Sequence, residues 1–370
     1  MSHIAIDARI VNSSSGRYVE RLLHYLQEVD TVNRYTILVP FEDKDYFMPT
    51  AENFVIQVAN YDNFSFAEQL GFKRYLDELE ADLVHFCMPQ QPILYKGTHV
   101  TTFHDLTILN VYNSDKNWLI FHAKQLVGKF VFRRVAHTSA ELIVPTQYVA
   151  DDLIAYTGVD PDKVTVTYEA AEVPDDKPKE YELPYEQFIM YVGRQSDYKN
   201  IKRLAAAHQR LIKKYPDLGL VLVGSKNASI KINEAYFTEK NYKNITFTGF
   251  LPDTQLNWLY RKASAYVFAS LSEGFGLPAL EAMGHGTPVV SSNATCLPEV
   301  YGDAAHYFDP TDVTDMARAI DEVLSSENLR KKLIEKGYER FKKYSWRKMA
   351  KETHEVYMKA LGTTSLPEQS

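Results

Sequence analysis

Short apolar segments rich in strand-forming residues alternate with longer segments of helical periodicity along the whole chain. Such alternation is typical of parallel sheets whose two faces are covered by helices. It predicts an α/β fold with two sets of strands. The first set lies at residues 3–7, 35–39, 82–86, 100–103, 141–144 and 164–168, and the second at residues 188–192, 219–223, 245–248, 265–269 and 288–291.

The segment between the two sets has the composition of an interdomain linker, because it contains three prolines and many acidic residues. A chain of 370 residues also exceeds the size at which one core usually keeps growing. We therefore expect two domains, then a last helix and a polar tail. The predicted parts are a first domain at 1–172, a linker at 173–187, a second domain at 188–345, a final helix at 346–361 and a tail at 362–370.

The composition excludes several classes of protein. Apolar residues make up 45% of the chain and charged residues 24%, as in globular proteins. The net charge of -7 argues against broad nucleic-acid binding, which needs a basic face. Cys87 and Cys296 are too few for a disulfide framework, no apolar run approaches the roughly 20 residues of a membrane span, and the N-terminus has no signal-peptide core. We expect a cytoplasmic protein that can be peripheral to a membrane.

The stretch EGFGLPALEAMGHGTPVV, which follows a predicted strand, carries the strongest chemical signal. Gly274 and Gly276 let the backbone approach a ligand without a Cβ in the way. Pro278 suits the first helical position, so the free N–H groups of the first turn face the loop and favour an anion. Glu273 precedes the turn and Glu281 lies in the first helical turn, and both carboxylates can accept hydrogen bonds from sugar hydroxyls. The stretch predicts a site for a nucleoside diphosphate sugar.

Other polar residues and glycines follow the predicted strands, at the edge where open parallel sheets bind ligands. Two facing sheets that both present such an edge would form a cleft between the domains. Arg194 and Lys199 lie close enough in sequence to reach one diphosphate, although isolated Lys and Arg side chains are most often solvated surface cations. The residues at the strand ends are Gly16, His104, Asp105, Thr146, Gly193, Arg194, Gly224, Gly249 and Glu273.

The spacing of Glu273 and Glu281 resembles the Glu-x7-Glu signature of the retaining glycosyltransferases of family 4. Similar segments extend over nearly the whole chain, in HIAIDARI, TFHDL, YVGRQSDYKN and LPEVYGDAAHYFDP. The resemblance implies the GT-B fold, in which two Rossmann-like domains with parallel sheets face each other across a cleft and the final helix crosses back onto the first domain. Within the family, the chain is most similar to bacterial mannosyltransferases that build O-antigen and related polysaccharides.

The resemblance assigns the donor contacts mainly to the second domain. It implies that Arg194 and Lys199 bind the diphosphate and stabilise the leaving nucleoside diphosphate. It implies further that Glu281 binds the ribose hydroxyls and that Glu273 contacts hydroxyls of the donor sugar. The backbone N–H groups that help to hold the sugar and the phosphates belong to Phe275, Gly276 and Leu277.

In the first domain, the resemblance assigns a donor-sugar contact to His104 and a loop-supporting role to Asp105, although a lone histidine is more often structural. Domain closure is expected, because the other donor contacts lie in the second domain. Two departures from the family pattern leave the acceptor side and the hinge open. Gly16 is alone where relatives often have two glycines, and Glu169-Ala170 stands where they often have Asn-Gly.

No metal site is predicted. Asp160-Pro161-Asp162 spells the Asp-x-Asp motif of metal-dependent transferases of another fold, but Pro161 places it in a turn, where solvent-facing carboxylates are ordinary. Histidine clusters are also missing from the sequence. We expect metal-independent chemistry without a cofactor.

The features together predict a retaining glycosyltransferase that moves a hexose, with mannose from GDP-mannose favoured, to a glycan or a lipid-linked oligosaccharide. The family implies a same-face displacement in which the departing phosphate oxygen takes the acceptor proton. Two other functions stay open, a sugar-nucleotide epimerase on the same fold and a noncatalytic sugar-nucleotide sensor. A glycosidase would need Glu273 and Glu281 on either side of the scissile bond, which is impossible if Glu281 binds the ribose.

A basic, aromatic helix is predicted at residues 116–137, with five Lys or Arg and no Asp or Glu. Its aromatic residues are Trp118, Phe121, Phe130 and Phe132. Such a helix can rest on an anionic membrane. It can also be a partly buried helix whose cations extend from a core-facing stripe to solvent, and we favour this second interpretation.

Overall fold

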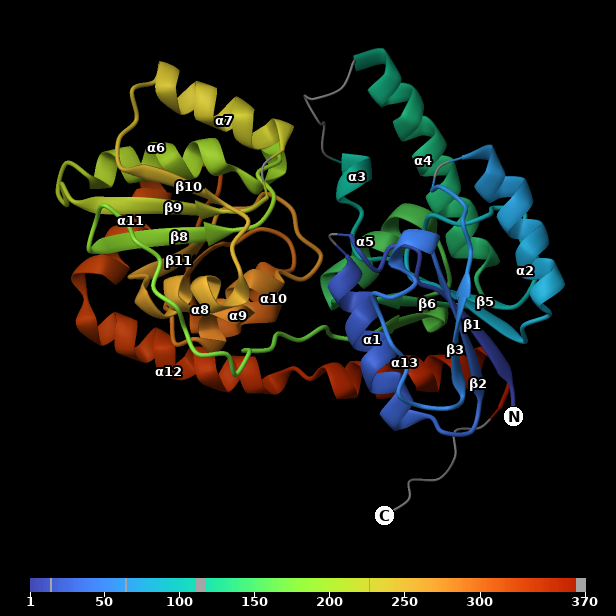
Figure 1. The fold of residues 1–370 in the computed structure, drawn as a ribbon. Helices are drawn as coiled ribbons and strands as arrows, with labels where there is room; N and C mark the ends of the chain where they lie inside the picture. The colour runs from blue at the N-terminus through green and yellow to red at the C-terminus, as the bar shows by residue number, and fades with distance from the viewer. Residues whose placement is uncertain (14, 64, 111–117, 226, 364–370) are drawn as a thin grey trace. The chain divides into compact units, whose positions relative to one another are not determined.

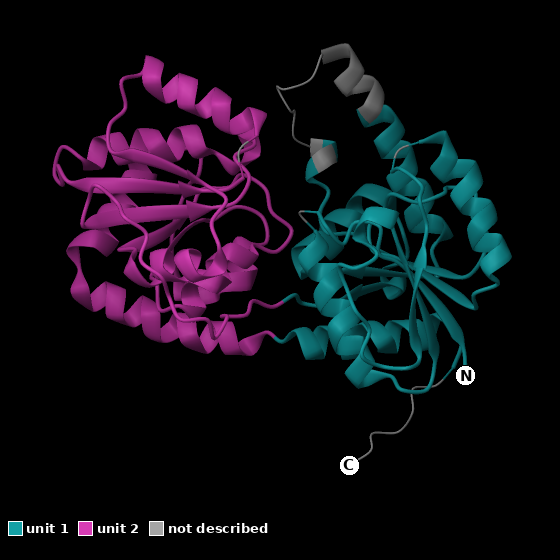
Figure 2. Cartoon of the chain, in the orientation of Figure 1, with its two compact units in different colours: residues 1–109, 122–169, 345–370 teal, residues 110–121, 170–344 magenta. Residues whose placement is uncertain are grey.

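The computed structural model describes residues 1–13, 15–63, 65–110, 118–225 and 227–363, of which residues 108, 110 and 118–124 are described by their backbone only. The chain divides into two compact units (Figure 2). Unit 1 comprises Met1–Leu109, His122–Glu169 and Ser345–Ser370, and unit 2 comprises Asn110–Phe121 and Ala170–Tyr344.

Unit 1 contains a seven-stranded sheet in which all neighbouring strands are parallel. Its strands are β1 (His3–Asp7), β2 (Arg34–Val39), β3 (Phe54–Val58), β4 (Leu83–Phe86), β5 (His99–Thr102), β6 (Glu141–Val144) and β7 (Val164–Val166). The strand order is β3-β2-β1-β4-β5-β6-β7. All residues of β1, β4, β5 and β6 are buried, as expected for interior strands covered on both faces.

The helices of this part of the chain form for local reasons that the sequence shows. Tyr18, Leu22 and Leu26 of the first helix repeat every four residues and are buried, which gives this helix one core-facing side. Another helix begins at Thr146, whose Oγ1 accepts a hydrogen bond from the N–H of Val149 at 3.2 Å. The helices are α1 (Gly16–Val29), α2 (Lys73–Leu79), α3 (Thr107–Asn110), α4 (Trp118–Thr138) and α5 (Gln147–Thr157), with a π-helical segment at Ala67–Phe72 and a 3-10 helix at Phe41–Asp43 and at Pro161–Lys163.

Unit 2 contains a six-stranded parallel sheet with its own helices. Its strands are β8 (Gln187–Val192), β9 (Leu218–Val223), β10 (Ile245–Gly249), β11 (Ala265–Phe268), β12 (Val289–Ser292) and β13 (Ala305–Phe308). Its helices are α6 (Ile201–Leu211), α7 (Ala228–Glu239), α8 (Asp253–Lys262), α9 (Leu277–Gly284), α10 (Leu297–Tyr301), α11 (Val313–Ser325) and α12 (Glu327–Lys343), with 3-10 helices at Asp197–Lys199 and Gly302–Ala304. Helices α6 and α7 lie on one side of the sheet, and α8 and α9 lie on the other (Figure 1).

The strand order of unit 2 is β10-β9-β8-β11-β12-β13. Strands β8, β9 and β10 therefore follow one another toward one edge of the sheet, and β11, β12 and β13 follow one another toward the other edge. This reversal places a topological switch point between β8 and β11. Open parallel sheets bind ligands at the carboxyl ends of the strands that flank such a point.

The predicted pair of parallel α/β sheets is confirmed, and each predicted strand is present with ends that differ by about two residues or less. The structure adds β3 and β13, which lie at an outer edge of each sheet. An edge strand pairs on one side only, so its side chains need less burial, and Val55 and Val58 of β3 are exposed. That the two sheets face each other across a cleft stays a prediction.

The segment predicted as the linker, 173–187, belongs to unit 2 and packs on it. The N–H of Lys179 donates to the carbonyl of Thr254 at 3.0 Å. The ring of Tyr185 covers Gly219 so closely that a Cβ there would lie 2.1 Å from the ring. Apolar and aromatic residues among the prolines give this segment packing contacts that a free linker would lack, and the boundary between the units falls at Glu169 instead.

The last helix, α13 (Trp346–Ala360), belongs to unit 1, where it packs against α1. Ser345 caps its start by accepting a hydrogen bond from the N–H of Lys348 at 3.4 Å. The hydroxyl of Tyr357 and Nδ1 of His85 on β4 lie 2.7 Å apart. Within the described part of the chain, no helix is both long enough and apolar enough to cross a membrane.

Candidate functional site

The first part of the site is a glycine junction at the carboxyl ends of β8 and β9. Gly193 follows β8 with a φ of 137°, where a side chain would be strained. Its N–H donates to the carbonyl of Val223 at 2.9 Å. A Cβ on Gly224 would lie 2.4 Å from the carbonyl oxygen of Gly193, so neither glycine can be replaced without moving the backbone.

The loop that follows carries the two predicted phosphate-binding cations. The side chain of Arg194 is exposed, and within the described part of the chain its guanidinium has no hydrogen bond or ion pair. Asn200 ends the loop with a φ of 62°. Its buried amide donates to the carbonyls of Ala269 and Pro310 at 3.0 and 2.7 Å, which ties the loop to the end of β11. The loop is therefore fixed at its base and presents a free arginine.

The structure brings Lys199 and Glu273 together, although they are far apart in sequence. Lys199 Nζ lies 2.5 Å from Glu273 Oε1, and the two side chains are 15% and 11% exposed. Burial alone would lower the pKa of Lys199, but the charge of Glu273 and the nearby Tyr191 and Tyr198 raise it above its ordinary value. Lys199 is therefore a permanent cation. Among the described residues, none donates a hydrogen bond to the second carboxylate oxygen, Oε2.

The glycine-rich turn after Glu273 is held by the surrounding core. Gly276 has a φ of 96°, and a Cβ there would lie 2.1 Å from the hydroxyl oxygen of Tyr301. That hydroxyl donates to the carbonyl of Gly276 at 2.6 Å. Phe275 is buried edge-on against Tyr344, with ring centroids 5.5 Å apart. The turn can therefore present its backbone N–H groups at a fixed position.

Helix α9 begins one residue earlier than predicted, which changes the place of Glu281. Gly276 is the N-cap, so Leu277 is the first helical residue and Pro278 the second. The prediction that Glu281 lies in the first turn is wrong, because an earlier start moves it into the second turn. Its side chain is buried, and the hydroxyl of Tyr260 donates to Oε2 at 3.0 Å. The carboxylate is thus held in one orientation by α8.

Three of the site residues predicted in unit 1 hold the local backbone in place. A Cβ on Gly16 would lie 1.8 Å from the carbonyl oxygen of Val11, so this glycine permits the tight entry into α1. Thr146 caps α5 and is committed to that role. Asp105 Oδ1 accepts a hydrogen bond from the N–H of Thr107 at 2.8 Å, within the loop before α3.

His104 lies at the end of β5 with both ring nitrogens engaged. Nε2 lies 3.0 Å from the carbonyl oxygen of Cys87, and Nδ1 lies 3.4 Å from Glu169 Oε1. The ring also meets Tyr18 of α1 edge-on, with centroids 4.8 Å apart. Burial alone would lower the pKa of His104, but the contacts with Glu169 and Cys87 raise it above its ordinary value.

Sequence reasoning missed three side chains that shape the site. Asn200 has the positive φ that asparagine tolerates better than most residues, and it directly follows Lys199, but nothing in the sequence shows its carbonyl partners. Tyr260 reaches Glu281 from another helix, which no local pattern reveals. Glu169 lies 3.4 Å from His104, a contact across a long separation in sequence that no local pattern reveals.

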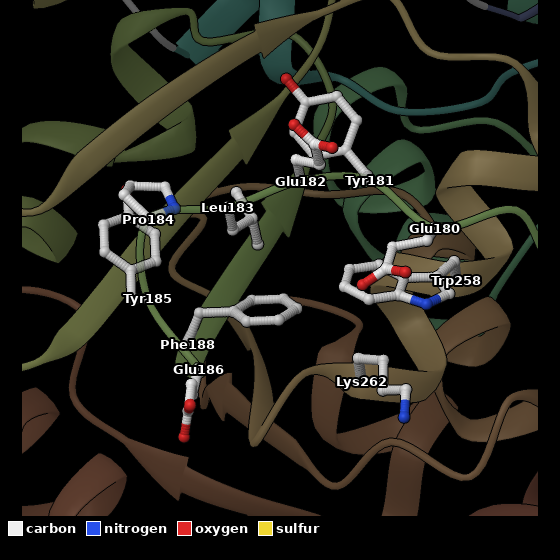
Figure 3. Close-up of a pocket in the computed structure, with 10 residues that line it drawn as sticks. All are labelled: Glu180, Tyr181, Glu182, Leu183, Pro184, Tyr185, Glu186, Phe188, Trp258 and Lys262. Atoms are coloured by element: carbon white, nitrogen blue, oxygen red, sulfur yellow. The ribbon is translucent and has the colours of Figure 1, made fainter.

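A hollow in unit 2 lies away from these residues (Figure 3). It has a volume of about 710 Å³ and is lined by Tyr181, Phe188, Trp258 and Lys262, among others. Phe188 lies at the start of β8 and Lys262 at the end of α8, so the hollow lies at the amino edge of the sheet. None of the predicted site residues lines it. We therefore place the candidate site at the opposite edge, where the cations, Glu273 and the start of α9 meet.

Two family models match successive parts of the chain. The family model "Glycosyltransferase Family 4" matches residues 15–172, and the model "Glycosyl transferases group 1" matches residues 173–340. The chain is 30% identical to O-antigen chain mannosyltransferase B of Escherichia coli over 275 residues, which cover 70% of this chain and 69% of the relative. The chain belongs to the family 4 glycosyltransferases.

Another relative and two solved structures show how much of the chain is similar to known proteins in sequence and in fold. The glycosyltransferase is 27% identical to the serotype-specific mannosyltransferase WbdA of Escherichia coli over 380 residues, which cover 92% of this chain but 44% of the relative. The chain thus spans less than half of that longer protein. Its fold is similar to sucrose-phosphate synthase from Thermosynechococcus elongatus, with a TM-score of 0.78, 19% identity and coverage of 98% and 100%. The Anabaena protein Alr3699/HepE, solved with UDP and glucose, gives a TM-score of 0.73, 15% identity and coverage of 97% and 100%.

Proposed function

We propose that this glycosyltransferase moves a mannosyl group from GDP-mannose to a glycan or a lipid-linked oligosaccharide, with retention of configuration and without a metal or other cofactor. The choice of mannose is supported by the two Escherichia coli relatives, whose names are mannosyltransferases. The observation that carries the proposal is the ion pair of Lys199 and Glu273 at the switch point of the sheet, directly before α9.

The cations of this site suit a departing nucleoside diphosphate. As the bond to the sugar breaks, negative charge develops on the phosphate oxygens, and fixed positive groups stabilise it without reorganising. Lys199 stays charged because Glu273 raises its pKa. Arg194 is free to swing toward the same phosphates. The N-terminus of α9 adds its partial positive charge, so these groups together do the work that a divalent ion performs in other transferases.

The two carboxylates suit the neutral ends of the donor. Glu273 holds Lys199 through Oε1 and leaves Oε2 for a sugar hydroxyl. Glu281, oriented by Tyr260, would accept hydrogen bonds from the ribose hydroxyls. The site thus combines one acceptor group for each polar end of the donor with cations for the phosphates between them.

The test follows mannosyl transfer from radiolabelled GDP-mannose to a lipid-linked glycan. We expect transfer without added divalent metal, no product from the donor alone, and loss of transfer in Glu273→Ala. Thermal-shift measurements should show stabilisation by GDP in preference to UDP and ADP. Strict magnesium dependence would contradict the mechanism, and a new sugar nucleotide formed from the donor alone would indicate an epimerase. Nucleotide binding with no turnover on any acceptor would indicate a sensor.

We also propose that α4 contacts an anionic membrane, where lipid-linked acceptors lie. The start of the predicted 116–137 helix lies outside the described residues, as do the side chains up to residue 124. In the described remainder, Leu126, Val127 and Phe130 are 70%, 63% and 61% exposed. They share one side of α4 with the exposed Arg133 and Arg134, whereas Val135 and Ala136 face the core. Exposed apolar side chains beside cations suit a lipid surface better than a fully core-directed stripe does.

Flotation with vesicles of phosphatidylglycerol and phosphatidylcholine tests the membrane proposal. We expect the wild type to float, and the variants Phe130→Asp and Arg133→Gln/Arg134→Gln to remain at the bottom of the gradient. The matched control is Lys342→Gln/Lys343→Gln, which removes the same charge from exposed positions at the end of α12. Equal flotation of all variants, or equal binding to purely neutral vesicles, would contradict the proposal.

A further inference from the structure

The contacts of His104 fix how its ring is protonated. A main-chain carbonyl can only accept a hydrogen bond, so the carbonyl of Cys87 at 3.0 Å requires a proton on Nε2. The other nitrogen, Nδ1, lies 3.4 Å from a carboxylate oxygen of Glu169. An unprotonated Nδ1 would turn its lone pair toward that negative charge. A second proton converts this repulsion into attraction between an imidazolium and a carboxylate.

Glu169 in turn needs a cation. Its side chain is only 8% exposed, so water cannot fully solvate the carboxylate. Among the described residues, the only ion pair of Glu169 is with His104. At 3.4 Å the contact is longer than a usual charge-assisted hydrogen bond, and the hydrogen bond and the charge of Glu169 both raise the pKa of His104.

The other titratable groups around His104 favour the same protonation. Asp105, the next residue, adds a second negative charge. Burial, with repulsion from His104, lowers the pKa of His85 on β4 to about 3, so His85 is neutral near pH 7. Burial raises the pKa of Tyr18 and of the Cys87 thiol well above their ordinary values, so these groups are neutral as well. Among the described residues of unit 1 that shift the pKa of His104, the charged ones are the carboxylates of Glu169 and Asp105.

We propose that Glu169 is a positioning residue that holds His104 as an imidazolium with both N–H groups committed, so that His104 serves the reaction as a fixed cation and not as a proton acceptor. The part about the reaction rests on the proposed transferase function, whereas the part about the ion pair does not. A neutral residue at position 169 would lack the charge that favours the second proton on His104.

The pH dependence follows from the direction of the shift. The pKa of His104 is raised on folding, so the pair contributes stability that is fully present below the unfolded value of about 6.5 and is lost as the pH rises through the folded value. If the imidazolium assists the reaction, activity falls over the same rise. A histidine that acted as a base would show the opposite, with activity rising as the proton leaves.

The first experiment titrates the full-length protein labelled with ¹³C at histidine Cε1 and follows it by NMR, with His104 assigned from His104→Gln. We expect Glu169→Gln, which keeps the volume and removes the charge, to lower the pKa of His104 by about one to three units. The matched control is Glu141→Gln, because Glu141 pairs with Lys359 at 2.7 Å and does not contact His104. The remaining histidine resonances report whether each variant is folded. Equal pKa values of His104 in the wild type and in Glu169→Gln would overturn the proposal.

The second experiment measures kcat/KM for transfer from GDP-mannose against pH. We expect an alkaline fall in the wild type, and the same fall displaced to lower pH in Glu169→Gln by the amount that the NMR titration gives. A profile that rises through the pKa of His104, or one that does not move in the variant, overturns the role in the reaction. If GDP-mannose gives no transfer at any pH, the proposed function fails and with it that role, while the NMR titration still decides the ion pair.

Discussion

The candidate site residues of the two units have different surroundings. In unit 2, glycines at positive φ bring the backbone into place, and Lys199 pairs with Glu273 while Arg194 stays free. In unit 1, His104 is enclosed by partners from elsewhere in the sequence, the carbonyl of Cys87 and the carboxylate of Glu169. One edge holds cations ready for an anion, whereas the other has already committed both nitrogens of its predicted ligand-binding residue.

This difference indicates that the two edges respond differently to substitution. Unit 2 should lose catalysis when a charge is removed, because under the proposed function its charges bind the donor. It should lose its shape when a glycine is replaced, because the backbone itself forms the turn. Substitution of a charged group in unit 1 should lower stability more than catalysis, because these groups mainly form ion pairs with one another. The predictions below test this contrast, from the largest expected effect to the smallest.

The largest effect is expected for Lys199→Gln. Loss of one fixed positive group at the developing charge typically lowers kcat by about 10²- to 10³-fold. The assay is mannosyl transfer from GDP-mannose, and circular dichroism checks that the variant is folded despite the unpaired Glu273. The control is Lys202→Gln on α6, which removes a neighbouring charge and should retain activity. In the structure, Lys202 Nζ lies 5.4 Å from the ring centroid of Tyr236. Similar losses in both variants would mean that the ion pair has no special place in catalysis.

The second prediction compares two glycines with positive φ, one in each unit. Gly276→Ala meets both a left-handed backbone and the hydroxyl of Tyr301, whereas Gly158→Ala meets a φ of 70° and no atom within 4 Å. Backbone strain alone costs about 1–2 kcal/mol. We expect Gly276→Ala to lower the thermal midpoint clearly more than Gly158→Ala and to abolish stabilisation by GDP, which Gly158→Ala should retain. Equal thermal midpoints and equal stabilisation by GDP in the two variants would show that the turn at Gly276 can relax around a Cβ.

The sequence predicts unit 2 better than unit 1 for a physical reason. The turn after Glu273 and the start of α9 depend on neighbouring residues, so glycine and proline preferences are enough to locate them, with an error of one residue at the helix start. The environment of His104 depends on contacts across 17 residues to Cys87 and across a longer separation to Glu169. Tertiary contacts of this kind leave no local pattern, and neither do the contacts of Tyr260 with Glu281.

The third prediction concerns how unit 1 depends on the last helix. Asp30 lies 3.0 Å from His354 Nε2 of α13 and accepts a hydrogen bond from the hydroxyl of Tyr35 at 2.7 Å. Burial alone would raise the pKa of Asp30, but these contacts lower it well below its ordinary value. The stabilisation is therefore present above the unfolded pKa of about 3.9 and is lost as the pH falls through the folded value. We expect Asp30→Asn to cost about 1–3 kcal/mol at pH 7, measured by thermal unfolding.

The pH series decides the cause of this effect. The difference between Asp30→Asn and the wild type should begin to shrink below about pH 3.9, where Asp30 of the unfolded chain takes up a proton, and should vanish as the pH falls through the lower folded pKa. The exposed Asp45 provides the control, because Asp45→Asn should change stability little at either pH. A constant difference over the series would assign the effect to packing and not to charge.

The smallest effect is expected for Tyr260→Phe, which removes the hydroxyl that holds Glu281 Oε2 at 3.0 Å and leaves the ring in place. If Glu281 binds the ribose, the less constrained carboxylate should weaken GDP binding roughly fivefold, the equivalent of about 1 kcal/mol, with little change in kcat. Calorimetric titration with GDP measures this. The control Tyr307→Phe removes a hydroxyl that donates to the carbonyl of Gly302 and should bind GDP as the wild type does. Unchanged affinity in Tyr260→Phe would mean that this hydroxyl does not position Glu281 for GDP, and the contribution of tertiary contacts to the candidate site of unit 2 would then be smaller than the geometry suggests.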